Sequence, residues 1–96
     1  LECDHKEIAM DWKGFQRFYI DLKLPLMFIR GSQGILVCGY FDINTFDTTG
    51  EAAALVRGVN TFDDMLKAKV KCVSAAAAKL GVEEDMKGQE ALELLR

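Results

Sequence analysis

One stretch of the sequence constrains the fold more than any other, the apolar run between Gly34 and Asp42. Residues 35–41 carry no charge and are bounded by a glycine and an aspartate, which is typical of a strand covered on both faces. We therefore expect residues 35–41 to form the middle strand of a sheet, shielded above and below. The candidate site residues are expected to lie near the carboxyl end of this strand.

The length of the chain predicts one domain. A chain of 96 residues, half of them hydrophobic, can build a single core but not two. We expect residues 1–96 to form one α+β domain, with residues 1–6 as a mobile or edge segment. The formal net charge of −3 gives no reason to expect nucleic acid or an anionic membrane as a partner. No apolar run approaches the roughly 18 residues that a membrane span needs.

The cysteines indicate a reducing compartment. Cys3, Cys38 and Cys72 are odd in number and widely spaced, which argues against a disulfide framework and favours the cytoplasm. The start of the chain is acidic and lacks the apolar block of a signal peptide. His5 is the sole histidine, and with Cys3 and Asp4 it falls short of the roughly four ligands of a structural zinc site. We therefore predict no metal site, and the sequence identifies no cofactor.

The N-terminal half has the pattern of successive strands. A short apolar stretch at residues 8–10 is a first candidate, and residues 18–22 alternate as a half-buried strand does. Pro25 interrupts the pattern, and residues 26–29 form the next candidate strand. Two glycines in the polar loop 31–34 predict a hairpin into the strand at residues 35–41.

A short helix and another strand are expected after this central strand. Asp42 can cap a helical turn over residues 43–47, and threonines there predict that the turn stops before Gly50. The alanine-rich residues 52–57 are interpreted as a strand, although the alanines also suit a helix.

The C-terminal half has helical periodicity instead. Thr61 followed by Asp64 is close to a capping box, and an apolar stripe from Phe62 to Leu80 predicts a helix, broken or unbroken near Ala68. A glycine at position 81 predicts its stop. Residues 89–96 are expected to form a last helix, with Gly88 at its N-cap and with Ala91, Leu92 and Leu95 facing inward. The predicted class is α+β: a mostly antiparallel or mixed sheet of four to five strands from the N-terminal half, packed by two or three helices from the C-terminal half.

Several short motifs occur in a characteristic order. They are Leu24-Pro25, Gly34-x-x-x-Cys38-Gly39-x-x-Asp42, Gly58-Val59-x-Thr61-Phe62-Asp63-x-Met65-Leu66, Gly81-Val82, and Met86-x-Gly88-x-Glu90-Ala91-Leu92. With these motifs the chain resembles the YunC-like family of small bacterial and archaeal domains of unknown function, over about residues 14–95. Segment 43–53 departs from the resemblance, since relatives have a better helix there. The resemblance implies an α+β domain and no particular reaction.

Cys38 has two interpretations. As a nucleophile or redox thiol it needs an exposed sulfur beside a positive group or a helix N-terminus. As a structural residue it is a small buried side chain of a hydrophobic strand, which is the commoner role of a free cysteine.

A second candidate site combines Asp42, Arg57, Gly58 and Thr61. If strands 35–41 and 52–57 are parallel, their carboxyl ends lie side by side, where open α/β sheets place ligands. Free N–H groups of a helix that begins at Thr61 then suit an anion. The connection 42–51 is short for a parallel crossover. The alternative is that Asp42 and Thr61 are ordinary helix caps and Arg57 a surface charge.

Two functions from different classes follow. The first is a homo-oligomeric binding or assembly module, because strands 26–29 and 35–41 are apolar on both faces and few helices are left to cover them. The second is a small enzyme or metabolite-binding domain that uses Cys38, Asp42, Arg57, Gly58 and Thr61. A polar pocket at the end of strand 35–41 favours the second, and a flat apolar face there favours the first.

Overall fold

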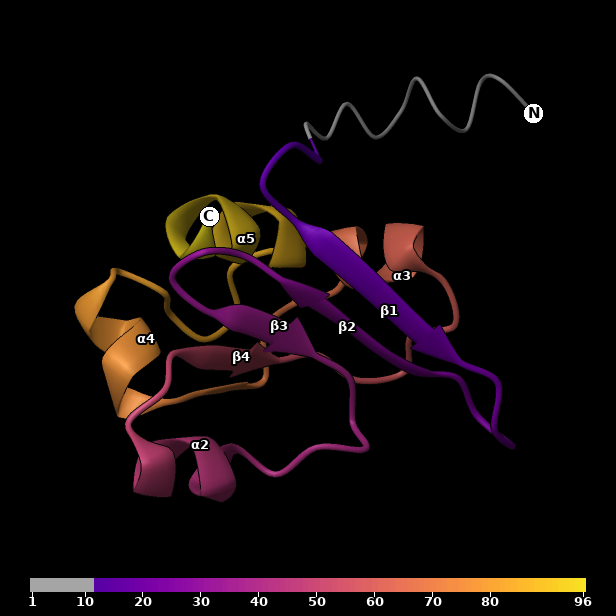
Figure 1. Cartoon of the computed structure of the whole chain (residues 1–96), viewed down its shortest axis with the longest axis horizontal. Coiled ribbons are helices and arrows are strands. Elements are labelled where there is room, and N and C mark those ends of the chain that lie inside the picture. The colour runs from indigo at the N-terminus through magenta and orange to yellow at the C-terminus, as the bar shows by residue number, and fades with distance from the viewer. Residues whose placement is uncertain (1–11) are drawn as a thin grey trace.

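Residues 12–96 are described by a computed structural model, in which four helices accompany a five-stranded sheet (Figure 1). The predicted α+β class is confirmed. The predicted strand at residues 8–10 and the segment 1–6 lie outside the described residues. The strands are β1 (Gln16–Ile20), β2 (Leu26–Arg30), β3 (Ile35–Val37), β4 (Ala53–Leu55) and β5 (Cys72–Val73); the helices are α2 (Ile43–Thr49), α3 (Phe62–Lys67), α4 (Ala75–Lys79) and α5 (Gly88–Leu95).

The sheet is mixed, and β3 is its middle strand. The spatial order follows the chain, β1-β2-β3-β4-β5. Neighbouring strands are antiparallel except β3 and β4, which are parallel. The hairpin between β2 and β3 is confirmed, and the Gly31 N–H closes it by donating to the Gly34 carbonyl at 2.8 Å. Leu36 and Val37 are fully buried, as expected for a strand shielded on both faces.

The middle strand is shorter than predicted. Cys38 still bonds to β2 through its N–H, which donates to the Met27 carbonyl at 3.2 Å, but the chain then turns at Gly39 and Tyr40. The Phe41 N–H closes this turn by donating to the Cys38 carbonyl at 3.2 Å. The prediction that residues 38–41 belong to the strand is wrong, because β3 ends at Val37 and the following turn brings Tyr40 to the surface.

The connection between the parallel strands contains helix α2. Asp42 caps it as predicted, since its Oδ1 accepts the Asn44 N–H at 2.9 Å, and Gly50 ends it with a φ of 80°. Because β3 ends at Val37 and β4 begins at Ala53, the crossover spans residues 38–52, which meets the length of about a dozen residues that parallel strands require.

One face of the sheet carries the main core. Met27, Ile29, Leu36 and Ala54 are fully buried there, beneath α3 and α5, which contact each other. This close approach depends on the first residue of α5, Gly88, because a Cβ added to it would collide with the Met65 carbonyl of α3.

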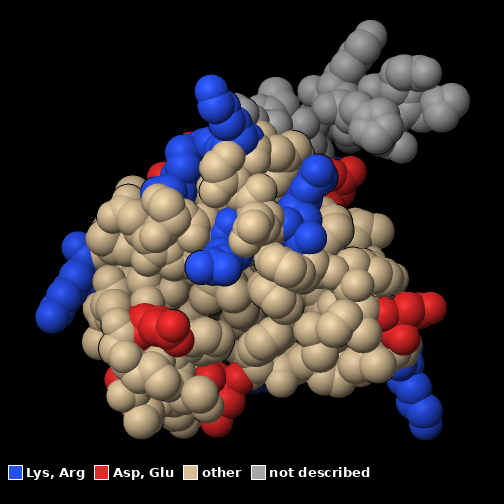
Figure 2. Space-filling view, viewed as in Figure 1, with Lys and Arg blue, Asp and Glu red and all other residues tan. Residues whose placement is uncertain are grey.

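The other face is covered by helices only in part. Phe28 lies against Phe18 and Phe41 on this face, with Phe41 in turn near Phe46 of α2. Helices α2 and α4 both contact β4, so Val37 and Leu55 are buried beneath this side. On this face no helix among residues 12–96 covers β1, whereas Tyr19 lies near Phe62 of α3 on the opposite face. Figure 2 shows Lys and Arg side chains near the middle of the view as well as at its rim, with an uncharged area to the right of the middle.

Strand β1 differs from its prediction in position and in burial. The strand occupies Gln16–Ile20 rather than residues 18–22, because the chain bends at residues 22–24 ahead of Pro25. All five residues of β1 are exposed, so the expected half-buried face is wrong. Apolar and polar residues do alternate along β1, but no layer formed by residues 12–96 covers its apolar side.

The helix predicted from Phe62 to Leu80 is broken near Ala68, which is one of the two alternatives, but the unbroken helix is wrong and a strand separates the two parts. Helix α3 ends at Lys67, residues Cys72–Val73 form β5 against β4, and α4 follows. The apolar stripe nevertheless marks buried positions, because Leu66, Val70 and Ala77 all lie in the core. A stripe at spacings of three and four can therefore be shared by two short helices and a strand.

The last helix forms as predicted, with Ala91, Leu92 and Leu95 fully buried. Its N-cap is Lys87 rather than Gly88, and the Lys87 N–H donates to Glu90 Oε1 at 3.0 Å.

Candidate functional site

A pocket lies at the carboxyl ends of the two parallel strands. It has a volume of about 340 Å³, and we call it the thiol pocket because Cys38 is in its wall. Its walls come from the turn after β3, the turn after β4 and the bend before β2. The lining residues are Leu24, Pro25, Cys38, Gly39, Tyr40, Gly58, Val59 and Asn60.

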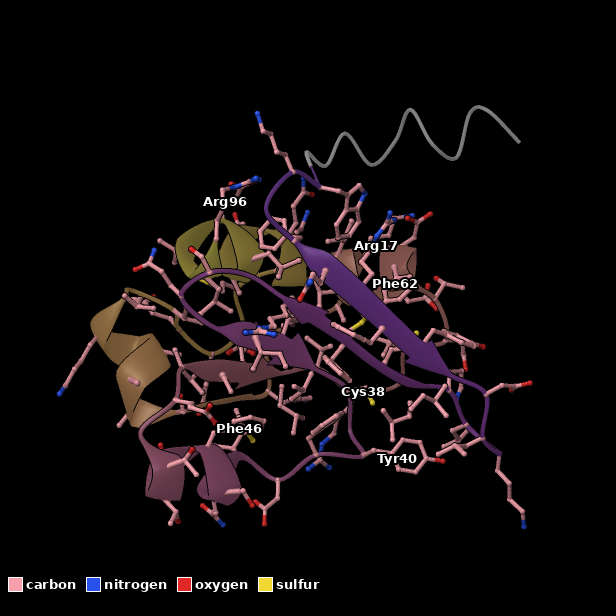
Figure 3. The ribbon with its side chains drawn as sticks, viewed as in Figure 1. Arg17, Cys38, Tyr40, Phe46, Phe62 and Arg96 are labelled. Carbon is pink, nitrogen blue, oxygen red and sulfur yellow. The ribbon has the colours of Figure 1, made fainter. Side chains whose placement is uncertain are left out.

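Cys38 is held in place by hydrogen bonds on both sides of its sulfur. Its Sγ accepts the Met27 N–H at 3.3 Å and donates to the Pro25 carbonyl at 3.9 Å. The residue is 3% exposed, and Figure 3 shows it near the end of the central strands with Tyr40 below it. This geometry fits the structural interpretation of Cys38, as a small buried side chain that also forms part of a pocket wall.

The pocket is mainly apolar. The Tyr40 hydroxyl accepts the Leu24 N–H at 3.3 Å and so links two walls of the pocket. The Asn60 N–H donates to Asp64 Oδ2 at 3.0 Å, which fixes the backbone of the third wall. The site can therefore hold a small apolar group and offers it a hydroxyl, an amide and a thiol.

The structure brings two of the five predicted site residues together. Cys38 and Gly58 line the thiol pocket, and the parallel pairing on which the prediction depended is present. Asp42, Arg57 and Thr61 are exposed and do not line the pocket.

Asp42 and Thr61 act as helix caps. Thr61 Oγ1 accepts the Asp64 N–H at 3.0 Å at the start of α3, just as Asp42 Oδ1 accepts a backbone N–H of α2. Arg57 lies beside Gly39, since a Cβ at position 39 would be 3.6 Å from the Arg57 Cγ. These three polar side chains therefore do not line one common pocket, contrary to the prediction.

Sequence reasoning missed Tyr40, Val59, Asn60 and the Leu24-Pro25 wall of the pocket. The apolar run predicts that Tyr40 lies in a buried strand, yet it is 48% exposed. The signal was the Gly39-Tyr40 pair before the helix cap Asp42, which marks a turn between two elements. The contribution of Leu24 has no such local signal, because it depends on the pairing of β2 with β3.

A wider groove of about 520 Å³ lies at the opposite end of the sheet. The loop between β2 and β3 forms one side, and Phe46 of α2 with Ala76 and Leu80 forms the other. Arg30 and Glu51 are its charged lining residues.

No group of three or more potential metal-binding side chains occurs within residues 12–96. In the same range, no helix is both long and apolar enough to cross a lipid bilayer.

The fold and the pocket define a small α+β domain built on one parallel strand pair within an otherwise antiparallel sheet. Residues 37–95 match the family described as Domain of unknown function (DUF1805), and the chain belongs to this family. It is 32% identical over 80 residues to the Uncharacterized protein YunC of Bacillus subtilis (strain 168). The match covers 76% of this chain and 79% of that protein.

A solved structure has a similar fold. It is that of a Protein of Unknown Function, TA1206, from Thermoplasma acidophilum. The match has a TM-score of 0.75 and 33% identity, and it covers 85% of this chain and 93% of that one. The family resemblance inferred from the ordered motifs is thus confirmed, in a bacterial and an archaeal relative.

Proposed function

We propose that this protein is a homo-oligomeric assembly module that associates with copies of itself through its first strand, β1, and the bend that follows it. One observation carries the proposal. Among residues 12–96 the exposed large hydrophobic side chains are Phe18, Tyr19, Ile20, Leu22, Leu24 and Tyr40. All but Tyr40 lie within residues 18–24, which we call the β1 arm.

The arrangement of these side chains distinguishes them from ordinary exposed apolar residues. Single apolar residues on a surface are common, whereas a continuous cluster marks an interaction site. The β1 arm is one stretch of chain at one edge of the sheet, and Tyr40 adjoins it through the hydrogen bond to the Leu24 N–H. A second copy of the chain carries the same apolar surface, and a twofold interface joins the same surface of two copies.

The test is the molar mass in solution. Light scattering after gel filtration at micromolar concentration is expected to give a multiple of the chain mass of 10.7 kDa. Ile20→Lys places a charge in the arm and is expected to give the monomer. Thr48→Lys, on the exposed side of α2, is the matched control and should keep the oligomer. A monomer for the unchanged protein contradicts the proposal.

A second candidate function is binding of a small metabolite in the thiol pocket. The observation that favours it is the location of this pocket at the carboxyl ends of β3 and β4, the position at which open sheets with parallel strands bind ligands. The ligand that fits is a mainly apolar molecule with a hydrogen-bonding group for Tyr40 or Asn60.

Ligand-induced thermal stabilisation tests this candidate. A ligand at 100 times its dissociation constant stabilises the fold by about 2.7 kcal/mol, which a thermal-shift screen of metabolites detects. Tyr40→Phe and Asn60→Ala are expected to reduce the shift, and Asp42→Asn, outside the pocket, is expected to leave it unchanged. A screen without any shift, or an equal loss in all three variants, counts against the pocket.

The protein is further proposed to work in the cytoplasm. Cys38 and Cys72 are both free thiols, which is the state that a reducing compartment maintains.

A further inference from the structure

No strand among residues 12–96 pairs with the outer edge of β1, and the direction of its backbone groups follows from the pairing with β2. The Gly31 N–H and the Cys38 N–H bond across the hairpin to Gly34 and Met27, so the odd-numbered residues of β2 direct their backbone groups towards β3. In an antiparallel ladder the neighbouring residues then face the other way. Phe28 therefore exchanges its hydrogen bonds with its partner Phe18. It follows that Arg17 and Tyr19 direct their N–H and C=O groups outward, away from the sheet.

Within residues 12–96 this edge has no proline, lysine, bulge or pairing strand, and its one charged residue is Arg17. Natural sheets protect their edges with proline, lysine, bulges or a covering element. Strand β1 reads Gln-Arg-Phe-Tyr-Ile and is exposed along its whole length, and no strand among residues 12–96 pairs with its outer side. The opposite edge of the sheet, β5, has just two residues, so β1 is the edge that can support a ladder.

We infer that β1 pairs antiparallel with β1 of a second copy, about a twofold axis that passes beside Tyr19. This inference rests on the proposed self-association and specifies its geometry. With the axis at Tyr19, each Tyr19 exchanges backbone hydrogen bonds with its counterpart, because its groups point outward. The two sheets become one continuous sheet of ten strands, since each contributes five.

Charge complementarity selects this register. An axis at Tyr19 places Arg17 of each copy opposite Asp21 of the other, which forms two ion pairs. An axis at Arg17 would instead oppose two arginines, and like charges directly opposite destabilise a sheet.

The apolar side chains support the same register. Phe18 comes opposite Ile20 of the second copy, and an aromatic residue opposite a β-branched residue is a favourable cross-strand pair. Each Phe18 keeps its stacking on Phe28, at 4.5 Å between the ring centroids. The register therefore covers the exposed side chains of β1 with complementary ones.

Disulfide trapping tests the register. The experiment uses the full chain with Cys3→Ser and Cys72→Ser, and Cys38 is left because it is buried. Directly opposed residues of a hydrogen-bonded pair have Cα atoms about 5.5 Å apart, within the range that a disulfide spans. Tyr19→Cys is therefore expected to form a covalent dimer on mild oxidation. Phe18→Cys is the matched control, because residue 18 lies diagonally from its own counterpart and beyond that range.

A charge swap provides an independent readout. Asp21→Arg opposes two arginines and is expected to shift the light-scattering mass towards the monomer. The double variant Arg17→Asp/Asp21→Arg restores opposite charges and is expected to recover the dimer. The melting temperature of each variant shows whether the fold itself is kept.

The outcomes separate the inference from the proposed function. A Tyr19→Cys dimer without a Phe18→Cys dimer supports both. A Phe18→Cys dimer alone, or no trapping in a protein that remains dimeric, overturns the register and leaves self-association intact. A monomeric unchanged protein overturns both.

Discussion

At the scale of single residues, Ser74 makes three hydrogen bonds through its hydroxyl. It is fully buried, and its Oγ accepts the Ala53 N–H at 2.8 Å and the Ala77 N–H at 3.3 Å while donating to the Glu51 carbonyl at 2.9 Å. The hydroxyl thus caps α4 and joins that helix to β4. The sequence gives little sign of this role, because Ser74 lies inside the apolar stripe that predicts a helix.

Ser74→Ala is expected to destabilise the protein more than the loss of an ordinary cap. Losing a cap costs about 1 kcal/mol, and leaving a buried backbone donor unsatisfied adds about 1–3 kcal/mol. Urea unfolding should therefore show a loss of about 2–4 kcal/mol. Thr61→Ala, which removes an exposed cap from α3, is the matched control at about 1 kcal/mol. Equal losses for the two variants would contradict this account.

Gly88 gives a second prediction at this scale. Gly88→Ala forces α5 away from the Met65 carbonyl of α3, and overpacking of a core typically costs about 1–3 kcal/mol. The expected loss lies at or above the upper end of that range. Gly50→Ala is the comparison, because Gly50 has a φ of 80° but open space around it, so its cost is backbone strain of about 1–2 kcal/mol. Thermal unfolding of both variants checks the order, and a smaller loss at Gly88 would refute it.

At the scale of elements, the sequence predicts those features that depend on interactions between residues close in the chain. The hairpin loop 31–34, the caps Asp42 and Thr61 and the inward face of α5 were all predictable, because each depends on residues close in sequence. The break after Lys67 was not, because β5 forms by pairing with β4 across the fold. The β-branched Val70 and Val73 followed by Ser74 were the available signal for a strand and then a helix start.

The candidate site was predictable to a similar extent. The parallel pairing located a ligand site at the ends of β3 and β4, and Cys38 and Gly58 do line a pocket there. Asp42 and Thr61 were predicted both as caps and as ligand groups, and the geometry supports the caps. Sequence alone could not decide this, because the direction of an exposed side chain depends on how the turn after β3 folds.

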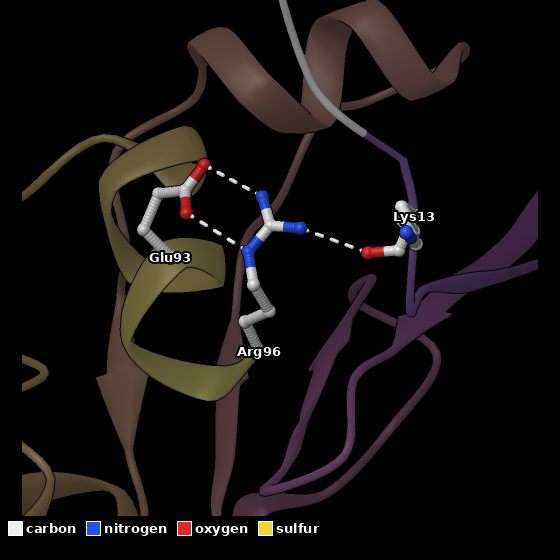
Figure 4. Close-up of polar contacts among 3 residues, drawn as sticks. All are labelled: Lys13, Glu93 and Arg96. Carbon is white, nitrogen blue, oxygen red and sulfur yellow. Dashed lines mark hydrogen bonds and ion pairs between the residues drawn. The ribbon is translucent and has the colours of Figure 1, made fainter.

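Arg96 connects the last helix to the segment before β1, and this contact gives a prediction at the element scale. Its guanidinium bonds to both Glu93 carboxylate oxygens at 3.1 and 2.9 Å and to the Lys13 carbonyl at 2.8 Å (Figure 4). It also lies 4.6 Å from the centre of the Phe15 ring. Arg96→Ala is expected to cost about 1–2 kcal/mol, mainly through the lost contacts to Lys13 and Phe15.

Glu93→Gln is the matched control for Arg96→Ala. The ion pair is partly exposed, and exposed pairs contribute about 0–1 kcal/mol, so this variant should cost less. Hydrogen exchange at residues 13–17 is expected to speed up in Arg96→Ala and to change little in Glu93→Gln. Unchanged exchange in both variants would show that the contact does not hold the segment.

At the scale of the whole molecule, the sheet exposes more apolar surface than helices α2 to α5 cover. Helices α3 and α5 cover one face across the middle strands, and α2 and α4 lie mainly against β4 on the other. The β1 arm remains exposed, although its Tyr19 lies near Phe62 of α3. Covering it by a second copy couples folding to association, because the buried surface is lost when either copy unfolds.

This coupling predicts a melting temperature that depends on protein concentration. Each tenfold rise in concentration adds about 1.4 kcal/mol per dimer to the free energy of unfolding, which corresponds to roughly 3–5 °C for two chains of this size. Differential scanning calorimetry over a hundredfold range of concentration measures the effect. Ile20→Lys is expected to remove the dependence and Thr48→Lys to keep it. A melting temperature of the unchanged protein that stays constant over this range would mean that β1 remains exposed to water in the folded state.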